Sequence, residues 1–249
     1  MKVLELKSGS AVEVTFHTIL YTRHVYPERE MDRGDAEWLV TDHDLRTCGV
    51  EIFQKKQKYG LPVWQSRSPP LNEYLSRVIE CVIEELNKNT LQKVVLVVKN
   101  ASIDETPIER FVFDFESLVP PDEVPADDVD FVPEDGGVTR LDLEDLFRSV
   151  LSKLMFASKT LAELKREVTF AVVVEMKDGS DMPESQAAKN KLVPVEWIPA
   201  EQRVTSEAEG RSRLNPLRTV RMGMLNMQLL VEELEGRNPP SSDMSTMTA

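Results

Sequence analysis

The sequence is poor in the residues that most often carry chemistry. Of 249 residues, only two are Cys and three are His. Neither Cys48 nor Cys81 belongs to a CxxC pair, so the sequence supports neither a disulfide framework nor a structural zinc site. The motifs GxSxG, HExxH, GxxxxGK[ST] and GxGxxG are absent as well, and with them the usual signatures of hydrolases, zinc peptidases and nucleotide-binding enzymes. We therefore expect no cofactor, no metal and no enzymatic activity.

The histidines and carboxylate pairs do not change this expectation. His17 and His24 fall on one predicted helix but lie farther apart than the i,i+4 spacing of helical metal ligands, and His43 falls in an irregular stretch. A zinc or general-base site is the alternative to the simpler interpretation, which is a helix-surface and a loop histidine. Glu84–Glu85 and Glu232–Glu233 are expected on a solvated helix and a solvated strand edge.

Long apolar runs are also missing. No stretch reaches the roughly 20 apolar residues that a membrane helix needs, and no cationic-then-apolar leader follows Met1, so we expect a soluble, intracellular protein without a membrane partner.

The chain has 30 Lys+Arg and 43 Asp+Glu, a formal net charge of −13. An acidic surface repels phosphate backbones unless a local basic patch overrides the mean. Direct nucleic-acid binding is therefore not expected.

Three segments interrupt an otherwise single domain, predicted over residues 1–235. An acidic loop over 116–138 contains eight Asp and Glu up to Asp135, no Lys or Arg in that part, and four prolines that exclude a regular helix. Residues 28–50 lack helical or strand periodicity and are interpreted as an insertion. Residues 236–249, rich in Pro, Ser, Thr and Met, are expected to form a disordered tail.

Three amphipathic helices are predicted by apolar residues at spacings of three and four. The first runs over 11–26 and is blocked by Pro27. The second opens at Pro69–Pro70 and closes near 87–89. The third, the longest, has a buried stripe from Leu143 through Leu154 to Leu161.

Strand patterns lie between these helices. Residues 93–99 form a continuous apolar run of the kind found in strands covered on both faces. Residues 109–115 alternate, and the two segments are expected to pair as a hairpin. Residues 169–175 supply a further strand, with Phe170, Val172 and Val174 on one face. The order of elements predicts an α+β domain, with helices packed on a mostly antiparallel sheet.

The last third of the chain, residues 178–235, contains no predicted long helix. It alternates polar, turn-rich stretches with a strand-like segment at 192–198 and an apolar but weakly periodic segment at 214–233. Such a segment either covers the sheet of its own domain or wraps around another molecule.

Several ordered blocks of this sequence resemble the HORMA-domain family. They are 16–27 (FHTILYTRHVYP), 52–63 (IFQKKQKYGLPV), 71–74 (LNEY), 93–98 (KVVLVV), 109–113 (ERFVF), 197–202 (WIPAEQ) and 214–233. The similarity covers most of residues 11–233 and is strongest to the family branch that provides the non-catalytic accessory subunit of translesion DNA polymerase zeta. It implies a HORMA fold in which residues 178–235 form the segment called the safety belt.

The resemblance implies a binding mechanism. In this family the safety belt closes over an extended, proline-containing peptide of a partner. Tyr74 and Trp197 match the aromatic residues that anchor the peptide of the polymerase catalytic subunit. The simpler interpretation, that both are ordinary core aromatics, would be preferred without the resemblance.

Two further contacts are implied in the same way. Leu214, Gln228 and Leu230 match positions that bind the C-terminal domain of a scaffolding translesion polymerase, although the family usually has Tyr at the third position. Arg148 matches an arginine at contacts between two HORMA domains. From the residues alone, Leu214 could pack within the belt, and Gln228 and Arg148 could simply face solvent.

The expected function is therefore that of a nuclear adaptor in translesion DNA synthesis. It would trap a peptide of the polymerase zeta catalytic subunit and bridge it to the scaffolding polymerase. A spindle-checkpoint or meiotic HORMA adaptor with a different client is the nearest alternative. An enzyme that uses a carboxylate pair and a direct DNA-binding module are alternatives from other classes, and the latter would show steep salt dependence without any partner.

Overall fold

The computed structural model describes residues 2–26, 52–101, 105–118, 138–164, 167–180, 197, 212–223 and 225–234. In order, its elements are α1 (Lys2–Thr22), β1 (Phe53–Lys58), β2 (Leu61–Ser66), α2 (Pro69–Asn87), β3 (Leu91–Asn100), β4 (Pro107–Ser117), α3 (Arg140–Ala157), β5 (Val168–Met176), β6 (Ser212–Arg221) and β7 (Leu225–Leu234). The fold class is the predicted one, with three helices and antiparallel sheets.

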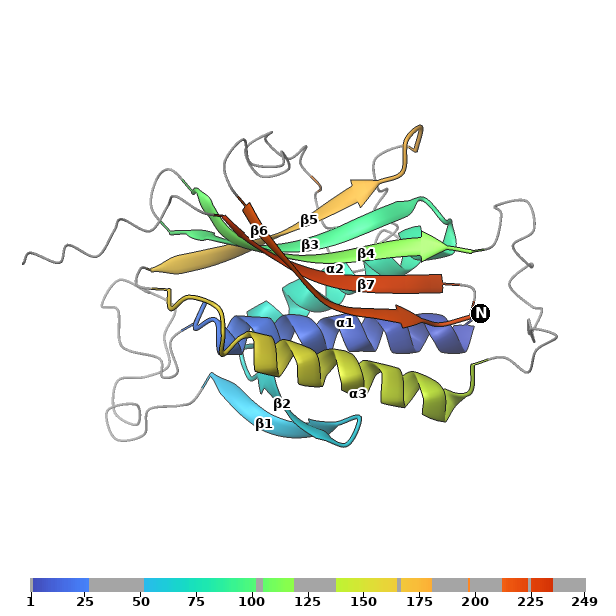
Figure 1. The fold of residues 1–249 in the computed structure, drawn as a ribbon, viewed down its shortest axis with the longest axis horizontal. Coiled ribbons are helices and arrows are strands. Elements are labelled where there is room, and N and C mark those ends of the chain that lie inside the picture. The colour runs from blue at the N-terminus through green and yellow to red at the C-terminus, as the bar shows by residue number, and fades with distance from the viewer. Residues whose placement is uncertain are drawn as a thin grey trace, which may run out of the picture.

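The elements form three layers (Figure 1). The main sheet has the strand order β5-β3-β4-β7-β6, and every neighbouring pair is antiparallel. The three helices cover one face of this sheet, and the β1–β2 hairpin packs on the other side of the helices. The predicted hairpin of residues 93–99 and 109–115 is confirmed as β3 and β4, and the predicted strand 169–175 is confirmed as β5.

Local signals account for the bounds of α2 and α3. Two prolines occupy the first turn of α2, where a missing N–H costs no helical hydrogen bond. A capping box opens α3, in which Thr139 and Asp142 satisfy each other's backbone N–H groups. The hydrogen bonds from Thr139 lower the pKa of Asp142.

Two predicted helix bounds are wrong. The first helix runs from Lys2 to Thr22 rather than over 11–26. Its first residues carry no apolar stripe that would indicate the early start, and it ends earlier because His24 adopts a left-handed φ of 50°. The third helix ends at Ala157, so Leu161 lies beyond it, although Leu161 still packs against the core.

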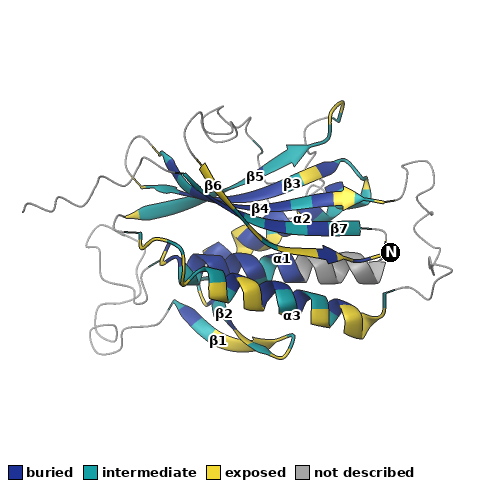
Figure 2. Ribbon diagram, in the orientation of Figure 1, coloured by how far each residue is buried: buried dark blue, intermediate teal, exposed yellow. Residues whose placement is uncertain are grey.

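The core lies between the helices and the main sheet, and both faces of β3 are buried as predicted. Val94, Leu96 and Val98 face the helices, whereas Val95 and Val97 belong to a smaller cluster on the opposite face. Figure 2 shows the burial of β3 and β4 at the centre of the sheet and the increasing exposure toward β6 and the β1–β2 hairpin. The centre of the sheet is therefore the most solvent-protected part of the described fold.

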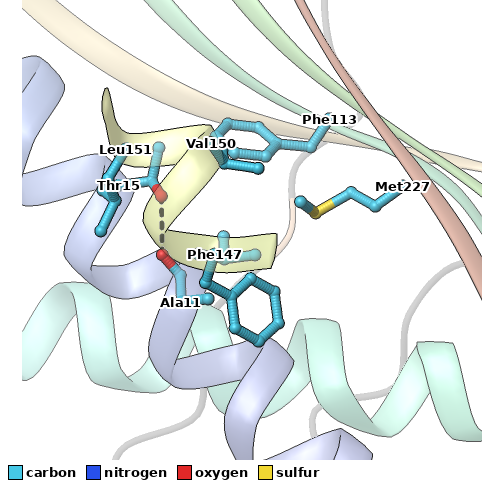
Figure 3. Close-up of a pocket in the computed structure, with 8 residues that line it drawn as sticks. Ala11, Thr15, Phe113, Phe147, Val150, Leu151 and Met227 are labelled. Atoms are coloured by element: carbon cyan, nitrogen blue, oxygen red, sulfur yellow. Dashed lines mark hydrogen bonds between the residues drawn. The ribbon is translucent and has the colours of Figure 1, made fainter. Parts of the chain in front are cut away.

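A narrow apolar crevice lies where α1, α3, β4 and β7 meet (Figure 3). It is lined by Ala11, Val12, Thr15, Phe113, Phe147, Val150, Leu151 and Met227. Its one polar side chain, Thr15, donates a hydrogen bond of 2.7 Å to the Ala11 carbonyl of its own helix. A lining without a free polar group has the chemistry of core packing rather than of a polar ligand site.

Each charged side chain that is buried in the described part of the chain pairs with a side chain of opposite charge. Arg23 Nε donates to a Glu109 carboxylate oxygen at 2.7 Å, and the same guanidinium donates to the Ala162 carbonyl at 2.6 Å. These bonds tie the end of α1 to β4 and to the segment that follows α3. Burial raises the pKa of Glu109 even though the Arg23 charge opposes this effect.

Three expectations of solvent exposure are wrong. Glu85 is 3% exposed and Glu232 is 7% exposed, because Thr90 and Lys88 donate to the first and Arg110 donates to the second. These carboxylates stabilise the fold. His17 is 1% exposed rather than at the helix surface, since its ring faces the β2 strand.

Two strand pairs are not anticipated from the sequence. β1 and β2 join through Tyr59 and Gly60, both with positive φ (49° and 71°), as a two-residue hairpin turn requires. The weakly periodic segment 214–233 forms β6 and β7 instead of one irregular stretch. The insertion 28–50, the tail 236–249, most of the acidic loop and most of segment 178–211 lie outside the described residues; Glu116 and Ser117, assigned to the loop, belong to β4.

Candidate functional site

The candidate site lies along β5, one edge strand of the main sheet. β5 pairs with β3 on one side and has no second partner strand among the described residues. The other edge of β3–β4 is taken by β7, which is followed by β6. An edge strand presents backbone N–H and C=O groups that can pair with another chain. The described sheet therefore offers a strand-addition surface at β5.

Tyr74 stands beside this edge. It projects from α2, is 39% exposed, and meets Phe170 of β5 edge to face at a centroid distance of 5.9 Å. Tyr26, which follows α1, meets the same Phe170 ring at 6.2 Å. The three rings form an aromatic cluster, Tyr26–Phe170–Tyr74, at the start of β5.

The electrostatics of this cluster keep both hydroxyls neutral. Burial raises the pKa of Tyr74, the nearby Tyr26 adds to the rise, and a backbone hydrogen bond with Val172 opposes it. Burial likewise raises the pKa of Tyr26. A neutral phenol can donate or accept a hydrogen bond while its ring packs on an apolar partner.

Trp197 lies against the same helix. Its indole Nε1 donates to the Sγ of Cys81 at 3.1 Å, and its ring packs against the main core. Burial raises the pKa of the Cys81 thiol, and the Trp197 hydrogen bond opposes the rise. Tyr74 and Cys81 are i,i+7 on α2, about 10 Å apart along one face. Tyr74, which contacts β5, and Trp197, which contacts Cys81, are thus associated with positions two turns apart on α2.

The course of the chain connects the two edges of the sheet. It leaves β5 at Met176, contacts α2 at Trp197, and returns as β6 and β7 at the opposite edge. The described residues thus place the two ends of this segment at opposite edges of the sheet, with Trp197 against α2.

The second predicted set of site residues is brought together on one face of the sheet. Side chains alternate between the two faces along β7. Met227 and Leu229 belong to the core on the helix side, so Gln228 and Leu230 point away from the helices. Leu214 of β6 pairs with Glu232, the next residue on that same face, and is 57% exposed. These three side chains form a semi-exposed patch on the β6–β7 hairpin, the hairpin patch.

Arg148 on α3 is held by two contacts. Its Nε donates to the Tyr59 carbonyl at 2.7 Å, and its guanidinium pairs with Asp145 at 2.8 Å. The side chain is nevertheless 47% exposed. It therefore fixes the β1–β2 turn to α3 and still presents part of its surface to solvent.

Three residues near these sites were not predicted from the sequence to belong to them. Phe170 was assigned only to a strand face and Tyr26 only to a helix end, yet they complete the cluster around Tyr74. Phe156 lies two turns after Arg148 on α3 and is 70% exposed. An apolar residue in an amphipathic stripe is normally assigned to the core, so its exposure cannot be inferred from spacing.

The described residues show no other chemical site. No group of three or more His, Cys, Asp or Glu side chains in these ranges is arranged to hold a metal ion. None of the described helices is long and apolar enough to cross a membrane.

Comparison with known proteins gives the family. The HORMA domain model matches residues 10–199. The chain is 31% identical over 224 residues to the human mitotic spindle assembly checkpoint protein MAD2B, covering 89% of this chain and 87% of that protein, and 30% identical over 222 residues to the Danio rerio protein of the same name, with 89% and 87% covered. It is 28% identical over 233 residues to the DNA polymerase zeta processivity subunit of Schizosaccharomyces pombe, covering 90% of each.

Solved structures agree on the fold. A chain in the crystal structure of the mitotic checkpoint complex superimposes with a TM-score of 0.64 at 16% identity, covering 92% of this chain and 97% of that one. Caenorhabditis elegans HTP-2 bound to the HIM-3 closure motif gives 0.57 at 14% identity, with 90% and 87% covered. At such identities the likeness concerns the fold alone.

Proposed function

The chain belongs to the HORMA-domain family, and we propose that it is the non-catalytic adaptor subunit of DNA polymerase zeta in translesion DNA synthesis, acting in the nucleus. The similarity to a processivity subunit of that polymerase over 90% of the chain supports the choice of complex. The absence of catalytic motifs from the sequence is in keeping with an accessory role.

One observation carries this proposal. In the described part of the chain, β5 has a partner strand on one side only, while β7 and β6 occupy the opposite edge of the sheet. Trp197, from the segment between β5 and β6, contacts α2 through Cys81. These placements support a peptide-trapping adaptor, because a strand of another chain could add to β5 beside α2.

The peptide would bind by strand addition. Backbone groups along Val168–Met176 would pair with an extended segment of the catalytic subunit, which supplies affinity without regard to side chains. Tyr74 and Trp197 would contact the side chains of that segment and supply specificity, since buried aromatic anchors dominate such interfaces. A proline in the peptide is tolerated on an edge because its missing N–H can face outward.

The hairpin patch would serve the second partner. Leu214, Gln228 and Leu230 lie on the sheet face opposite the helices, whereas Tyr74 projects from a helix. Two partners could thus bind at once, which is what bridging the catalytic subunit to the C-terminal domain of a scaffolding translesion polymerase demands. Leu230 contributes apolar contact alone at this patch, as it lacks the ring and hydroxyl of tyrosine.

Peptide binding provides the test. Synthetic proline-containing peptides of the catalytic subunit would be titrated by calorimetry into the wild-type chain and into Tyr74→Ala and Trp197→Ala. Truncating an anchor of this kind is expected to weaken binding by roughly 30-fold or more, equivalent to about 2 kcal/mol. Trp197→Phe, which keeps one aromatic ring but loses the Nε1–H and part of the indole surface, should weaken it less.

Leu214→Ala is the matched control, because it removes an apolar side chain from the hairpin patch and leaves the β5 edge intact. It should bind peptide as the wild type does and lose affinity for the second polymerase. Undiminished peptide binding by both anchor variants would count against the groove, and therefore against the proposed function.

A spindle-checkpoint or meiotic adaptor is the second candidate. The relatives named as mitotic spindle assembly checkpoint proteins favour the checkpoint role. The same groove would then hold a different client. Competition between a polymerase peptide and checkpoint or meiotic closure peptides for the wild-type chain would separate the two, because the physiological client should displace the others.

A further inference from the structure

The β1–β2 hairpin has a charge opposite to that of the whole chain. Residues 52–72 contain Lys55, Lys56, Lys58 and Arg67 and no Asp or Glu, in a protein of net charge −13. Because a local field depends on nearby charges more than on the total, this segment can attract an anion that the rest of the surface repels.

The hairpin holds these lysines in solvent. All four residues from Lys55 to Lys58 are exposed, so side chains on both faces of β1 reach water. The hairpin is firmly attached on its other side: Trp64 stacks on Tyr21 of α1 at a centroid distance of 3.9 Å, and Phe53 meets the same ring at 5.6 Å. Arg148 fixes the turn through the Tyr59 carbonyl.

The lysine charges are not neutralised within the described residues. No described carboxylate forms a salt bridge with Lys55, Lys56 or Lys58, and Lys58 lies 5.6 Å from the centre of the Tyr59 ring. Lys58 acts on Glu13 of α1 at a distance: burial raises the pKa of Glu13, and the charge of Lys58 opposes the rise. Asp145 is paired with Arg148.

We propose that the β1–β2 hairpin binds the phosphate backbone of nucleic acid without reading its sequence. Lysine suits this role because its ammonium is a compact charge on a flexible stem that needs no shaped pocket. Gln54 and Gln57 alternate with the lysines and can donate further hydrogen bonds to phosphate oxygens. A two-stranded ribbon of this kind is also narrow enough for the major groove of a duplex.

An acidic protein segment is the less favoured partner. Such a segment gains its affinity from apolar anchors as well as from charge, and the largest apolar side chains of the hairpin, Phe53 and Trp64, are engaged with Tyr21. This binding goes beyond the proposed adaptor role and does not depend on it. It would keep the protein close to a template that its partners hold.

The test is fluorescence anisotropy with the full-length chain and labelled duplex and single-stranded oligonucleotides of random sequence. The key variant is Lys55→Gln/Lys56→Gln. The control is Lys153→Gln/Lys159→Gln, which removes two exposed lysines of equal charge from the end of α3 and the turn after it. Thermal unfolding of each variant verifies the fold.

The salt dependence gives the expected result. Three phosphate contacts predict an affinity loss of about 40-fold between 50 and 200 mM salt, and one remaining contact predicts a loss of about 3- to 4-fold. The hairpin variant should show the smaller loss and the control the larger one. Equal behaviour of the two variants, no binding by the wild type at 50 mM salt, or binding of oligo-glutamate in place of nucleic acid would overturn the proposal.

A protective role for the lysines would be recognised in the same samples. Charged side chains on an edge strand prevent association between sheet edges. If the hairpin variant self-associates while its affinity for the oligonucleotides stays at the control level, the lysines act in this way and the proposal is overturned.

Discussion

His17 shows how strongly one buried side chain can couple this fold to pH. Its Nδ1 accepts a hydrogen bond of 3.4 Å from the Ser66 backbone N–H, and its Nε2 has no partner among the described residues. Burial, aided by the charge of Lys56, lowers the pKa of His17 to about 4. The imidazole is therefore neutral in the folded protein at pH values where it would be charged in the unfolded chain.

This shift predicts a loss of stability in mild acid. The unfolded chain takes up the proton below a pKa of 6.5 and the folded protein only below about 4, so the stabilisation is complete above pH 6.5 and is lost as pH falls toward 4. The largest effect is roughly 3 kcal/mol in the free energy of unfolding. Urea denaturation of the wild type and His17→Gln between pH 7.5 and 4.5 measures it.

The difference in stability between these two proteins isolates the histidine, because the carboxylates titrate alike in both. We expect the wild type to lose its advantage over His17→Gln across this range. A difference that stays constant with pH would show that His17 is charged in the folded state or that the unfolded chain does not protonate it.

At the residue scale, the resemblance proposes positions but not their surroundings. Tyr74 and Trp197 are assigned as peptide anchors by resemblance alone; in the structure Tyr74 of α2 meets Phe170 of β5, and Trp197 donates to Cys81 of α2. The burial of His17, Glu85 and Glu232 could not be predicted, because periodicity gives the side of an element and not the residues that come to meet it from elsewhere in the chain.

Among the elements, α3 combines core packing with an exposed apolar surface. Leu143, Phe147 and Leu154 are buried beneath it. On its outer side Leu141 and Phe156 are 72% and 70% exposed, with Arg148 between them. Large exposed apolar side chains beside a half-exposed arginine are typical of protein interfaces, and a second HORMA domain is the partner that the family resemblance implies for Arg148.

Self-association through α3 can therefore be tested at Phe156. Phe156→Ala should weaken any dimer of the wild type by about tenfold or more, since an exposed aromatic contributes to an interface and little to the fold. Sedimentation velocity over a concentration series measures the dimer. Arg148→Ala should also weaken it, but it additionally frees the β1–β2 turn, so its unfolding temperature should fall.

Leu118→Ala provides the control, as it changes an exposed apolar residue (51%) that lies outside α3. Equal dimerisation of the wild type and Phe156→Ala would exclude α3 as the contact.

The elements that the sequence predicted are those with strong, long patterns. α2, β3 and β4 combine apolar stripes or runs with clear end signals; all three were predicted, and so was the pairing of β3 with β4. β1 was missed because residues 55–58 are exposed on both faces, which leaves no alternation to detect. β6 was missed because Pro216 and a register shift after it obscure the period of two.

At the scale of the whole molecule, one ionic network joins the belt to the sheet. Arg110 of β4 contacts Glu232 of β7 at 3.2 Å and Glu175 of β5 at 3.8 Å, and Glu175 in turn contacts Lys93 of β3 at 3.2 Å. All four side chains lie on the face opposite the helices. The network thus spans β5, β3, β4 and β7, and it ties the strand that closes the belt to the strand that would receive the peptide.

This connection predicts how fast a trapped peptide is released. If the belt must open before the peptide leaves, dissociation requires local unfolding, and weakening the attachment of β7 should speed it. Glu232→Gln removes the charge that faces the buried Arg110 guanidinium and should lower stability by roughly 1–2 kcal/mol. Peptide dissociation, followed by stopped-flow competition, should then accelerate by about 5- to 30-fold.

The control is Glu73→Gln, which removes a carboxylate from the exposed pair with Arg77 on α2 and leaves β7 attached. Because the peptide would touch neither Glu232 nor Arg110, a faster release in Glu232→Gln alone would come from the weakened network and not from a lost peptide contact. Equal dissociation rates in both variants, with the stability of Glu232→Gln clearly reduced, would mean that the peptide leaves without opening of β7, and that strand addition at an open edge describes the binding better than enclosure does.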